Sequence, residues 1–349
     1  MDTNPLLGVL LHAVGGLAAA SFYIPYTRVK NWEWESFWLV GGIFSWLISP
    51  IIAALILCPN LVGILSNAPL SSLFWTYLFG VLWGVGGLTF GMSVRYLGQS
   101  LGFSISLGFC AFFGTLIPPL FLGTILGLMQ SLSGVVVLVG LGVCLGGILV
   151  CGLAGMRKEK QLSEEEKKAS VKEFNFMAGL WLAFFAGIMS ACMAFAFTSG
   201  DPIAALAVKM GTPSIFSNMP ILVVVMLGGL TTNAVWCIYL NVKNKSAANY
   251  TTAGSASLPV NYFLCALAGI TWYLQFFFYG MGETRMGATF SFSSWTLHMA
   301  FIIVFSNLWG LLLKEWKATD RKTHGLLFVG IAVLVISTII VGYGNYLKG

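Results

Sequence analysis

Five polar side chains occur inside or beside apolar stretches, where their types could bind a polar solute or carry a proton. Gln275 offers an amide that both donates and accepts hydrogen bonds, and Arg285 offers a fixed positive charge. Glu283, His298 and, far earlier in the chain, His12 can each gain or lose a proton. Polar and ionisable groups are costly at membrane depth and usually face a cavity or a pathway. We therefore interpret these residues as candidates for a solute site with a proton site beside it.

The spacing of the residues after Gln275 predicts a polar stripe on one helix. Tyr279 and Glu283 follow Gln275 at successive intervals of four positions, and residues four apart share a helix face. Aromatic rings nearby supply flat surfaces for the C–H groups of a solute, although packing is the alternative role for such a run. Pro25 predicts a kink at the end of the first helix, which its neighbouring tyrosines could line. The candidate substrate-binding residues are Trp272, Tyr273, Gln275, Tyr279, His298 and Tyr23.

A proton-coupled carrier needs a group whose protonation changes in the working range of pH. Histidine has an unperturbed pKa of about 6.5, and glutamate starts near about 4.3 and rises when it is desolvated. The candidate proton-coupling residues are therefore Glu283, His298 and His12. Two alternatives stay open: an interfacial ion pair between Glu283 and Arg285, and histidines that simply hydrogen-bond to neighbouring hydroxyls.

The composition excludes a soluble protein. Hydrophobic residues make up 58% of the 349 residues and charged residues 9%, and the mean hydropathy is +0.87. Soluble domains carry about 25% charged residues. The net charge of +6 is modest and, in a membrane chain, reports loop orientation rather than affinity for nucleic acid. We expect a polytopic protein whose partners are the lipid bilayer and a small molecule, with no nucleic acid.

Neither a metal nor another cofactor is expected. The seven cysteines are scattered in or beside apolar segments, without a CxxC pair or metal-ligand spacing, and are interpreted as small buried residues. Neither HExxH nor a phosphate-binding loop occurs in the sequence. No soluble segment is long enough to fold alone as a sensor output domain. The sequence therefore predicts a protein that is not an enzyme.

Ten apolar segments are long enough to cross a bilayer, which takes about 20 residues in a helix. The charged stretch after the fifth segment is interpreted as a solvated linker. It divides the chain into a first five-helix half (1–155), a linker (156–174) and a second five-helix half (175–349). Gly200–Thr212 is expected to be a loop, and Glu283 and Arg285 to lie on a hinge between helices. The predicted spans are Pro5–Tyr26, Phe37–Leu57, Leu73–Tyr96, Ser100–Leu122, Leu132–Gly152, Phe176–Ser199, Ser214–Leu240, Tyr262–Gly282, Ala288–Leu313 and Leu326–Tyr346.

The two halves resemble each other. Sliding residues 80–98 along the chain by one displacement pairs several residues of the third span with those of the eighth, and a weaker match pairs Gly16 and Ala19 with Gly187 and Ser190. Because five spans is an odd number, the second copy enters from the opposite side, which predicts a 5+5 inverted repeat. The pairs in the third and eighth spans are Gly80 with Gly269, Trp83 with Trp272, Gly91 with Gly280, and Met92 with Met281.

Lysine and arginine concentrate in the loops after the odd-numbered spans, which the positive-inside rule places in the cytoplasm. The central linker is then cytoplasmic, and both termini are predicted to be periplasmic.

The exit of the first span (FYIPYTRVKNWEWESFWLVGGIFSW), the run WYLQFFFYGMGETRMG and the segment SSWTLHMAFIIVFSNLWGLLLKEW resemble the L-rhamnose–proton symporter family. That family belongs to the drug/metabolite transporter superfamily, and the resemblance extends over essentially the whole chain. It implies an all-α inner-membrane carrier of ten helices that imports L-rhamnose, or a related deoxy sugar, with a proton by alternating access. The chain departs from enterobacterial members at Glu283, where they carry a histidine, so the coupling residue stays open.

Other functions remain open at this point. A carrier or exporter of another small solute from the same superfamily, driven by sodium or by protons, fits the same pattern. The exact sugar, the direction of flux and the choice between monomer and homodimer are likewise open.

Overall fold

The computed structural model describes residues 4–97, 99–121, 123, 125–161, 175–252, 254, 257–286, 291–313, 316–317 and 319–347, and regular secondary structure there is helical throughout. Nine helices in these ranges are long and apolar enough to cross a membrane. The first part of the chain contains α1 (Pro5–Ser21), α2 (Tyr23–Tyr26), α3 (Trp34–Gly42), a π-helical segment η1 (Ile43–Ile48), α4 (Ser49–Leu57), α5 (Leu61–Asn67), α6 (Leu70–Leu97), α7 (Gln99–Phe121), α8 (Ile125–Gln130) and α9 (Leu132–Gln161).

The second part begins after the linker residues 162–174, which lie outside the described ranges. Its elements are α11 (Phe176–Ser190), α12 (Cys192–Lys209), the 3₁₀ turn η2 (Ser214–Phe216), α13 (Met219–Asn244), the 3₁₀ turn η3 (Ser246–Tyr250), α14 (Leu258–Met286), α15 (Ser291–Leu312) and α16 (Arg321–Tyr346).

Nine of the ten predicted spans correspond to helices that could cross a membrane, whereas the fourth lies in α7, whose described apolar part is the shorter Ile105–Gly114. Two predicted connections are wrong. The expected loop after residue 200 is helical, because α12 continues through Pro202 to Lys209. Proline inside a membrane helix is tolerated where neighbours satisfy the freed backbone groups. Glu283 and Arg285 do not lie on a hinge, since α14 continues to Met286. In both places the helix extends beyond the end of its apolar run.

Three predicted spans are interrupted, and the sixth divides into α11 and α12 at Ala191. The first changes from α1 to α2 at Phe22, three positions before Pro25, so the predicted kink is present. The second contains the π-helical segment η1, with Pro50 at the start of the helix that follows. Proline lacks the backbone donor that a regular helix needs there, and single π turns often occur at functional positions.

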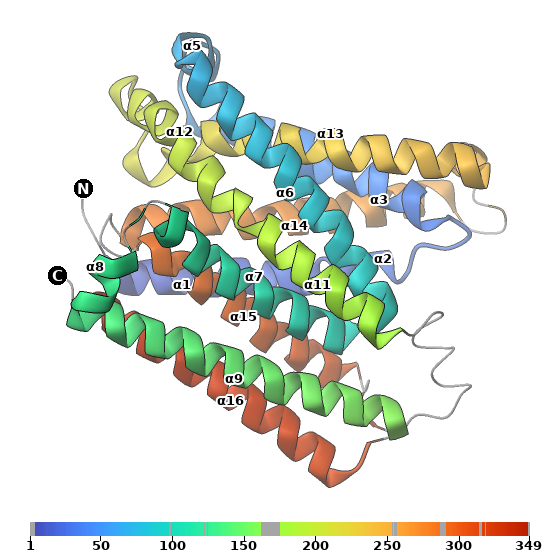
Figure 1. The fold of residues 1–349 in the computed structure, drawn as a ribbon. Helices are drawn as coiled ribbons and strands as arrows, with labels where there is room; N and C mark the ends of the chain where they lie inside the picture. Colours follow the sequence, from blue (N-terminus) through green and yellow to red (C-terminus); the bar gives the residue numbers. More distant parts are fainter. Residues whose placement is uncertain are drawn as a thin grey trace.

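The helices form one bundle with two distinguishable ends (Figure 1). The end at which α1 begins and α16 finishes is called the terminal end, and the end at which α9 finishes and α11 begins is called the mid-chain end. At the terminal end the backbone N–H of Asn4 donates to the carbonyl of Arg285 (3.0 Å), and at the mid-chain end that of Asn175 donates to the carbonyl of Tyr96 (3.3 Å).

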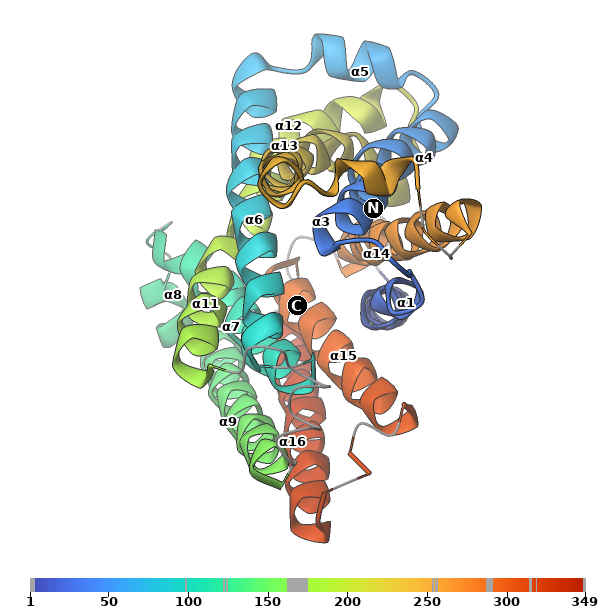
Figure 2. The ribbon, with the colours of Figure 1, turned by 90° about the vertical axis from the view of Figure 1, so that its right-hand side faces the viewer.

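The first helix of each half packs against two helices of the other half. Helix α1 packs against α14 and α15, and α11 packs against α6 and α7. Helix α13 packs against α6 and α3, while α9 and α16 lie side by side along one edge of the bundle (Figure 2).

Glycines allow the closest of these approaches. A methyl group added at Gly80 would collide with the carbonyl of Val225, and one at Gly269 with the carbonyl of Gly41. The fifth predicted span contains four closely spaced glycines, which predict close packing of helices. Two of them confirm this, since Gly140 and Gly147 face Val341 and Leu334 of α16. A methyl added at Gly142 or Gly146 would contact nothing.

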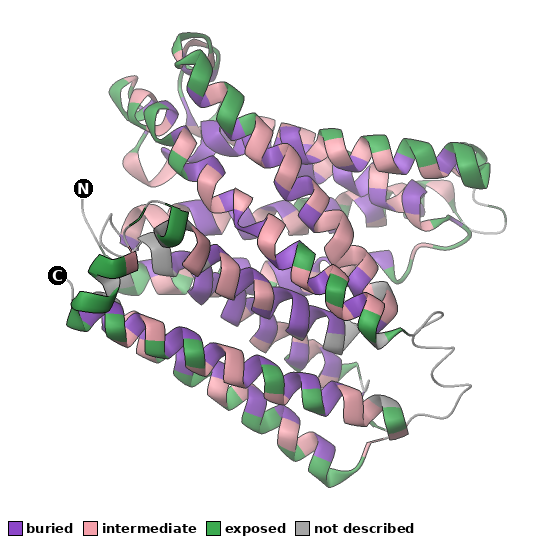
Figure 3. Ribbon diagram, viewed as in Figure 1, coloured by how far each residue is buried: buried purple, intermediate pink, exposed green. Residues whose placement is uncertain are grey.

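The outer faces of the bundle are apolar. Large side chains such as Ile56 (75% exposed) and Phe263 (65% exposed) point outward, and buried residues follow the inner faces (Figure 3). Soluble proteins rarely expose contiguous apolar surface on this scale. This surface is typical of helices that contact lipid.

A buried carboxylate ties α3 to η3 at the mid-chain end. Glu35 is 3% exposed, and its Oε1 accepts hydrogen bonds from Asn244 Nδ2 (3.0 Å) and Ser246 Oγ (2.6 Å). Ser246 also donates to Asn241 Oδ1 at 3.1 Å. This network links the first half of the chain to the second.

Candidate functional site

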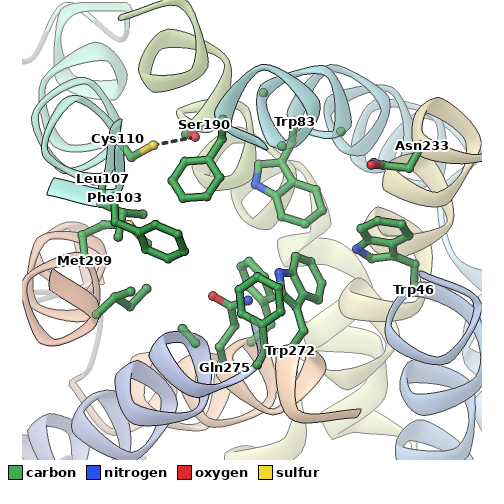
Figure 4. Close-up of a pocket in the computed structure, with 18 of the residues that line it drawn as sticks. Trp46, Trp83, Phe103, Leu107, Cys110, Ser190, Asn233, Trp272, Gln275 and Met299 are labelled. Carbon is green, nitrogen blue, oxygen red and sulfur yellow. Dashed lines mark hydrogen bonds between the residues drawn. The ribbon is translucent and has the colours of Figure 1, made fainter. Parts of the chain in front are cut away.

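A cavity lies in the middle of the bundle and receives side chains from both halves of the chain (Figure 4). Its empty space, including the open mouth, is about 770 Å³. The residues that line it are Ala19, Phe22, Trp38, Trp46, Trp83, Gly84, Gly86, Gly87, Phe90, Phe103, Leu107, Cys110, Ser190, Asn233, Trp272, Gln275, Phe276, Trp295, Met299 and Ile302.

Indole rings dominate one wall of the cavity. The ring of Trp272 lies 5.4 Å from that of Trp46 and 5.6 Å from that of Trp83, between centroids. Phe276 packs edge-on to Trp83 at 5.2 Å. These rings offer flat apolar faces of the kind that stack on the C–H surface of a small solute.

Polar atoms in the cavity are few, and several already have partners. Asn233 accepts a hydrogen bond from Trp38 Nε1 (3.0 Å) and donates one to the carbonyl of Gly229 (2.9 Å). Cys110 and Ser190 share a hydrogen bond of 2.9 Å between Sγ and Oγ. All of these groups are therefore engaged within the protein.

Several polar groups of the wall stay available to a ligand, among them the indole N–H groups of Trp83 and Trp272. Among the described residues, the buried Nε1 of Trp46 has no hydrogen-bonding partner. The side chain of Gln275 makes no hydrogen bond to another described residue, and Figure 4 shows it extending into the cavity together with the rings of Trp46, Trp83 and Trp272.

The structure brings two of the predicted substrate-binding residues to this cavity and places the others elsewhere. Trp272 and Gln275 line it. Tyr273 is buried on another side of α14, where its hydroxyl lies 3.9 Å from Met219 Sδ. Tyr23 packs with Phe22 and Tyr26, and Tyr279 and His298 lie next to the cavity without lining it.

Two histidines and a tyrosine from three helices pack together beside the cavity. The ring centroids of His12 (α1) and Tyr279 (α14) are 5.4 Å apart, and those of Tyr279 and His298 (α15) are 5.3 Å apart. The two imidazoles are 6.0 Å apart. Two of the three predicted proton-coupling residues, 286 positions apart in sequence, are thus neighbours.

Both imidazoles are enclosed by the protein. His12 and His298 are 0% exposed, and among the described residues their ring nitrogens have no hydrogen-bonding partner. The rings fill space that two glycines leave: a methyl at Gly15 would lie 3.0 Å from Cε1 of His298, and one at Gly282 would lie 2.9 Å from Cε1 of His12. A buried polar group without a partner costs about 1–3 kcal/mol. Among the described residues, the backbone of His12 is the one hydrogen-bonding group that acts on the His298 ring, without meeting the geometry of a hydrogen bond, so this pair is a candidate for a function.

Glu283, the third predicted proton-coupling residue, lies farther along α14. Its Oε2 accepts a hydrogen bond of 2.9 Å from Asn218 Nδ2, which also approaches the carbonyl of Gly280 at 3.4 Å. The side chain is half-buried near the terminal end of the bundle. The carboxylate is therefore fixed by an amide from the start of α13.

The sequence reasoning missed most of the cavity. Trp46, Ser190 and Trp295 come from three different helical segments and carried no signal that separates a lining residue from a packing residue. Asn233, a polar residue of the seventh predicted span, could contact a sugar or another helix, and the helix contact is the preferred interpretation from the sequence. Trp83 did carry a signal, since it was the repeat partner of Trp272, but the match was used only to infer the repeat.

No group of three metal-binding side chains occurs within the part of the chain that the structure describes, and the seven cysteines are free thiols. A helical bundle with apolar outer faces and an internal cavity built from both halves is typical of multi-pass membrane transport proteins. The chain belongs to the L-rhamnose-proton symport protein (RhaT) family, whose model matches residues 1–346.

Relatives support this assignment over the full length. L-rhamnose-proton symporters of Cronobacter sakazakii, Yersinia pestis and Yersinia pseudotuberculosis are each 36% identical to the chain over 346 residues, which cover 99% of both sequences.

Proposed function

We propose that this protein imports L-rhamnose, or a closely related deoxy sugar, together with a proton across the bacterial inner membrane. The observation that carries the proposal is the central cavity, in which the free amide of Gln275 stands among indole rings. The names of the full-length relatives supply the particular sugar and ion. A carrier of a different solute from the same superfamily is the alternative.

The chemistry of the cavity suits a deoxy sugar. Sugar hydroxyls lose hydrogen bonds to water on binding, and the amide of Gln275 and the indole N–H of Trp46 can replace some of them. The rings of Trp83 and Trp272 suit the C–H face, and the methyl group of a deoxy sugar needs only an apolar contact. We assign substrate binding to Trp272 and Gln275, with Trp46 and Trp83 added from the structure.

We further propose that the fold is a ten-helix, 5+5 inverted repeat of the drug/metabolite transporter type. In the proposed repeat, α1 is equivalent to α11, α6 to α14, and α7 to α15. Helix α1 packs on α14 and α15, and its equivalent α11 packs on α6 and α7, as the repeat requires. Helix α1 starts at the terminal end and α11 at the mid-chain end, as inversion requires (Figure 1). Equivalent close approaches also pair up: Gly16 on Phe301 with Gly187 on Phe109, Gly8 on Met286 with Gly179 on Leu97, and Gly269 on Gly41 with Gly80 on Val225.

The lining of the cavity supports the same symmetry. Each pair of equivalent helices is related by a constant difference in residue number. The same differences also relate seven pairs of lining residues, and each pair has one member in each half. A cavity lined in such pairs surrounds the two-fold axis, where alternating access requires a binding site. The pairs are Ala19 with Ser190, Trp83 with Trp272, Gly86 with Gln275, Gly87 with Phe276, Phe103 with Trp295, Leu107 with Met299, and Cys110 with Ile302.

We assign proton coupling to His12 and His298, which meet beside the cavity. Glu283 remains a second candidate because its carboxylate is half-buried on the same helix as Gln275. The halves would rock around the cavity to expose it alternately, with the mid-chain end in the cytoplasm and both termini in the periplasm.

Uptake of radiolabelled L-rhamnose into cells that express the protein tests the proposal. Unlabelled L-rhamnose should compete, Gln275→Ala should weaken uptake, and adding the sugar to energy-depleted cells should make the medium more alkaline. Uptake without a pH change would remove the proton, and competition by amino acids or cationic drugs instead of sugars would favour the alternative.

A further inference from the structure

Two ring contacts occupy equivalent positions near opposite ends of the cavity. Phe90 of α6 packs against Phe103 of α7 at 5.0 Å, and Tyr279 of α14 packs against Trp295 of α15 at 5.7 Å. The displacements that relate the two halves turn the first pair into the second. We call Phe90 and Phe103 the mid-chain ring pair, and Tyr279 and Trp295 the terminal ring pair, after the nearer end of the bundle (Figure 1).

The two ring pairs differ in how many of their members line the cavity. Both members of the mid-chain ring pair line it, whereas in the terminal ring pair only Trp295 does. Tyr279 is 3% exposed and stands behind Trp295, in contact with Phe197 at 5.5 Å. The cavity therefore ends at the terminal ring pair in this conformation and reaches the whole of the mid-chain ring pair.

The surroundings of the two pairs differ in their chemistry. Tyr279 contacts both His12 and His298. The equivalent positions in the other half hold Ala183 and Ser106, neither of which titrates. Ser106 shares a hydrogen bond of 2.8 Å with Ser93, the residue equivalent to Gly282.

Few other charged groups face the histidines. On α14 these are the Tyr279 phenol and, one turn on, Glu283 and Arg285. The described parts of α1 and α15 contribute none besides the histidines. The neighbouring α7 has none in its sequence, and the charged side chains of α16 lie in its first turn at the mid-chain end.

The distance between the two imidazoles opposes a second positive charge on the pair. Two imidazolium rings 6.0 Å apart with no exposure to water would repel each other strongly. A single proton converts one ring nitrogen from an acceptor to a donor. The protonated ring would then be stabilised by turning toward an acceptor, either the other imidazole or the Tyr279 hydroxyl.

We propose that a single proton shared by His12 and His298 controls the terminal ring pair alone, while the mid-chain ring pair responds to the sugar and not to the proton. This inference rests on the proposed function, because it divides the two co-substrates between two gates. The two halves would then share the same arrangement of helices, but only the terminal ring pair would have titratable neighbours.

Hydrogen exchange of the protein in lipid nanodiscs tests this division. Exchange is measured at two pH values one unit apart, with labelling times scaled for the intrinsic effect of pH, and with or without L-rhamnose. One linked proton changes an opening equilibrium by up to about tenfold per pH unit. We expect a change of that order around Tyr279 in α14 and around His298 in α15, and none around Phe90 and Phe103.

Variants and the sugar separate the possible outcomes. His12→Gln and His298→Gln, made singly, should each abolish the pH response, and the matched change Ser106→Ala should leave it intact. An equal pH response at both ring pairs, or one that survives in both histidine variants, would overturn the inference. If L-rhamnose alters neither ring pair while the pH response stays confined to the terminal pair, the proposed sugar is wrong and the proton assignment stands.

Discussion

Trp83 of α6 and Trp272 of α14 contact each other in the wall of the cavity, with ring centroids 5.6 Å apart and ring planes inclined by 42°. They are also equivalent residues of the proposed repeat. Two equivalent residues can touch only near the axis that relates them. If the proposed repeat holds, its axis and the candidate binding site lie between α6 and α14.

Truncating either indole should weaken sugar binding. Trp272→Ala and Trp83→Ala remove a stacking face, for which we expect a roughly tenfold higher Kd for L-rhamnose, corresponding to about 1.4 kcal/mol. Trp272→Phe should cost less. Calorimetric titration of the purified protein measures the affinity, and Trp181→Ala, on the exposed outer face of α11, is the control. Equal affinities in all variants would remove these rings from the site.

The thiol of Cys110 should report occupancy of the cavity. It lines the cavity and is 4% exposed, so a small maleimide should reach it slowly when the cavity opens. L-rhamnose should slow this alkylation several-fold, as followed by mass spectrometry of the Cys110 peptide. Cys151, which is equally buried but packs against α16, is the internal control. Protection of both thiols would indicate a general stabilisation instead of a bound sugar.

Filling the space beside the histidines should uncouple the proton from the sugar. A methyl at Gly15 would lie 2.9 Å from the carbonyl of Gln275 and 3.0 Å from Cε1 of His298, so Gly15→Ala must push α14 away from α1 and crowd the ring of His298. We expect this variant to lose sugar accumulation against a gradient while retaining some sugar exchange. Gly142→Ala, where the added methyl contacts nothing, should behave as the unmodified protein. Normal accumulation by Gly15→Ala would show that the position of His298 is unimportant.

Removal of the buried Glu35 carboxylate should destabilise the fold. Glu35→Ala removes the charged acceptor of hydrogen bonds from the exposed Asn244 and the buried Ser246, of which Ser246 keeps Asn241 Oδ1, and we expect a cost of about 1–2 kcal/mol. We expect a lower Tm in detergent, measured by intrinsic fluorescence, and a smaller loss for Glu35→Gln, which retains an acceptor oxygen. Glu33→Ala, two positions earlier and exposed, should change the Tm little.

Asp320 should make the mid-chain end of α16 sensitive to acid. Its carboxylate accepts hydrogen bonds from Thr323 and Arg157, and these lower the pKa of Asp320 below its usual value. A lowered folded-state pKa contributes stability above the unfolded-state pKa of about 3.9, and this is lost as the pH falls further. The Tm should therefore fall more steeply below about pH 4 in the unmodified protein than in Asp320→Asn, and parallel curves would contradict this assignment.

Long apolar segments were predicted well from the sequence because each must supply about 20 apolar residues, whatever its neighbours are. The ends of two helices were predicted wrongly. Helix α12 continues past Pro202 and α14 past Glu283, beyond the apolar residues from which the ends were predicted. The stripe of residues at intervals of four placed Gln275 in the cavity but not Tyr273, which lies two positions away and points to another side of α14. Residues such as Trp46 and Asn233 reach the site only through tertiary packing, which one sequence does not encode locally.

The scarcity of unpaired polar atoms in the cavity has a consequence for hydration. Solvent molecules need two to four hydrogen-bonding partners to be held firmly, and the unengaged indole N–H groups of Trp46, Trp83 and Trp272 are donors only, so the amide of Gln275 adds the one unengaged side-chain amide oxygen among the described lining residues. An arriving sugar then displaces loosely held water, and most of the dehydration penalty falls on the sugar itself. For the proposed function, each additional hydroxyl raises that penalty while its proton finds few acceptors in the wall, which would favour a hexose that ends in a methyl group.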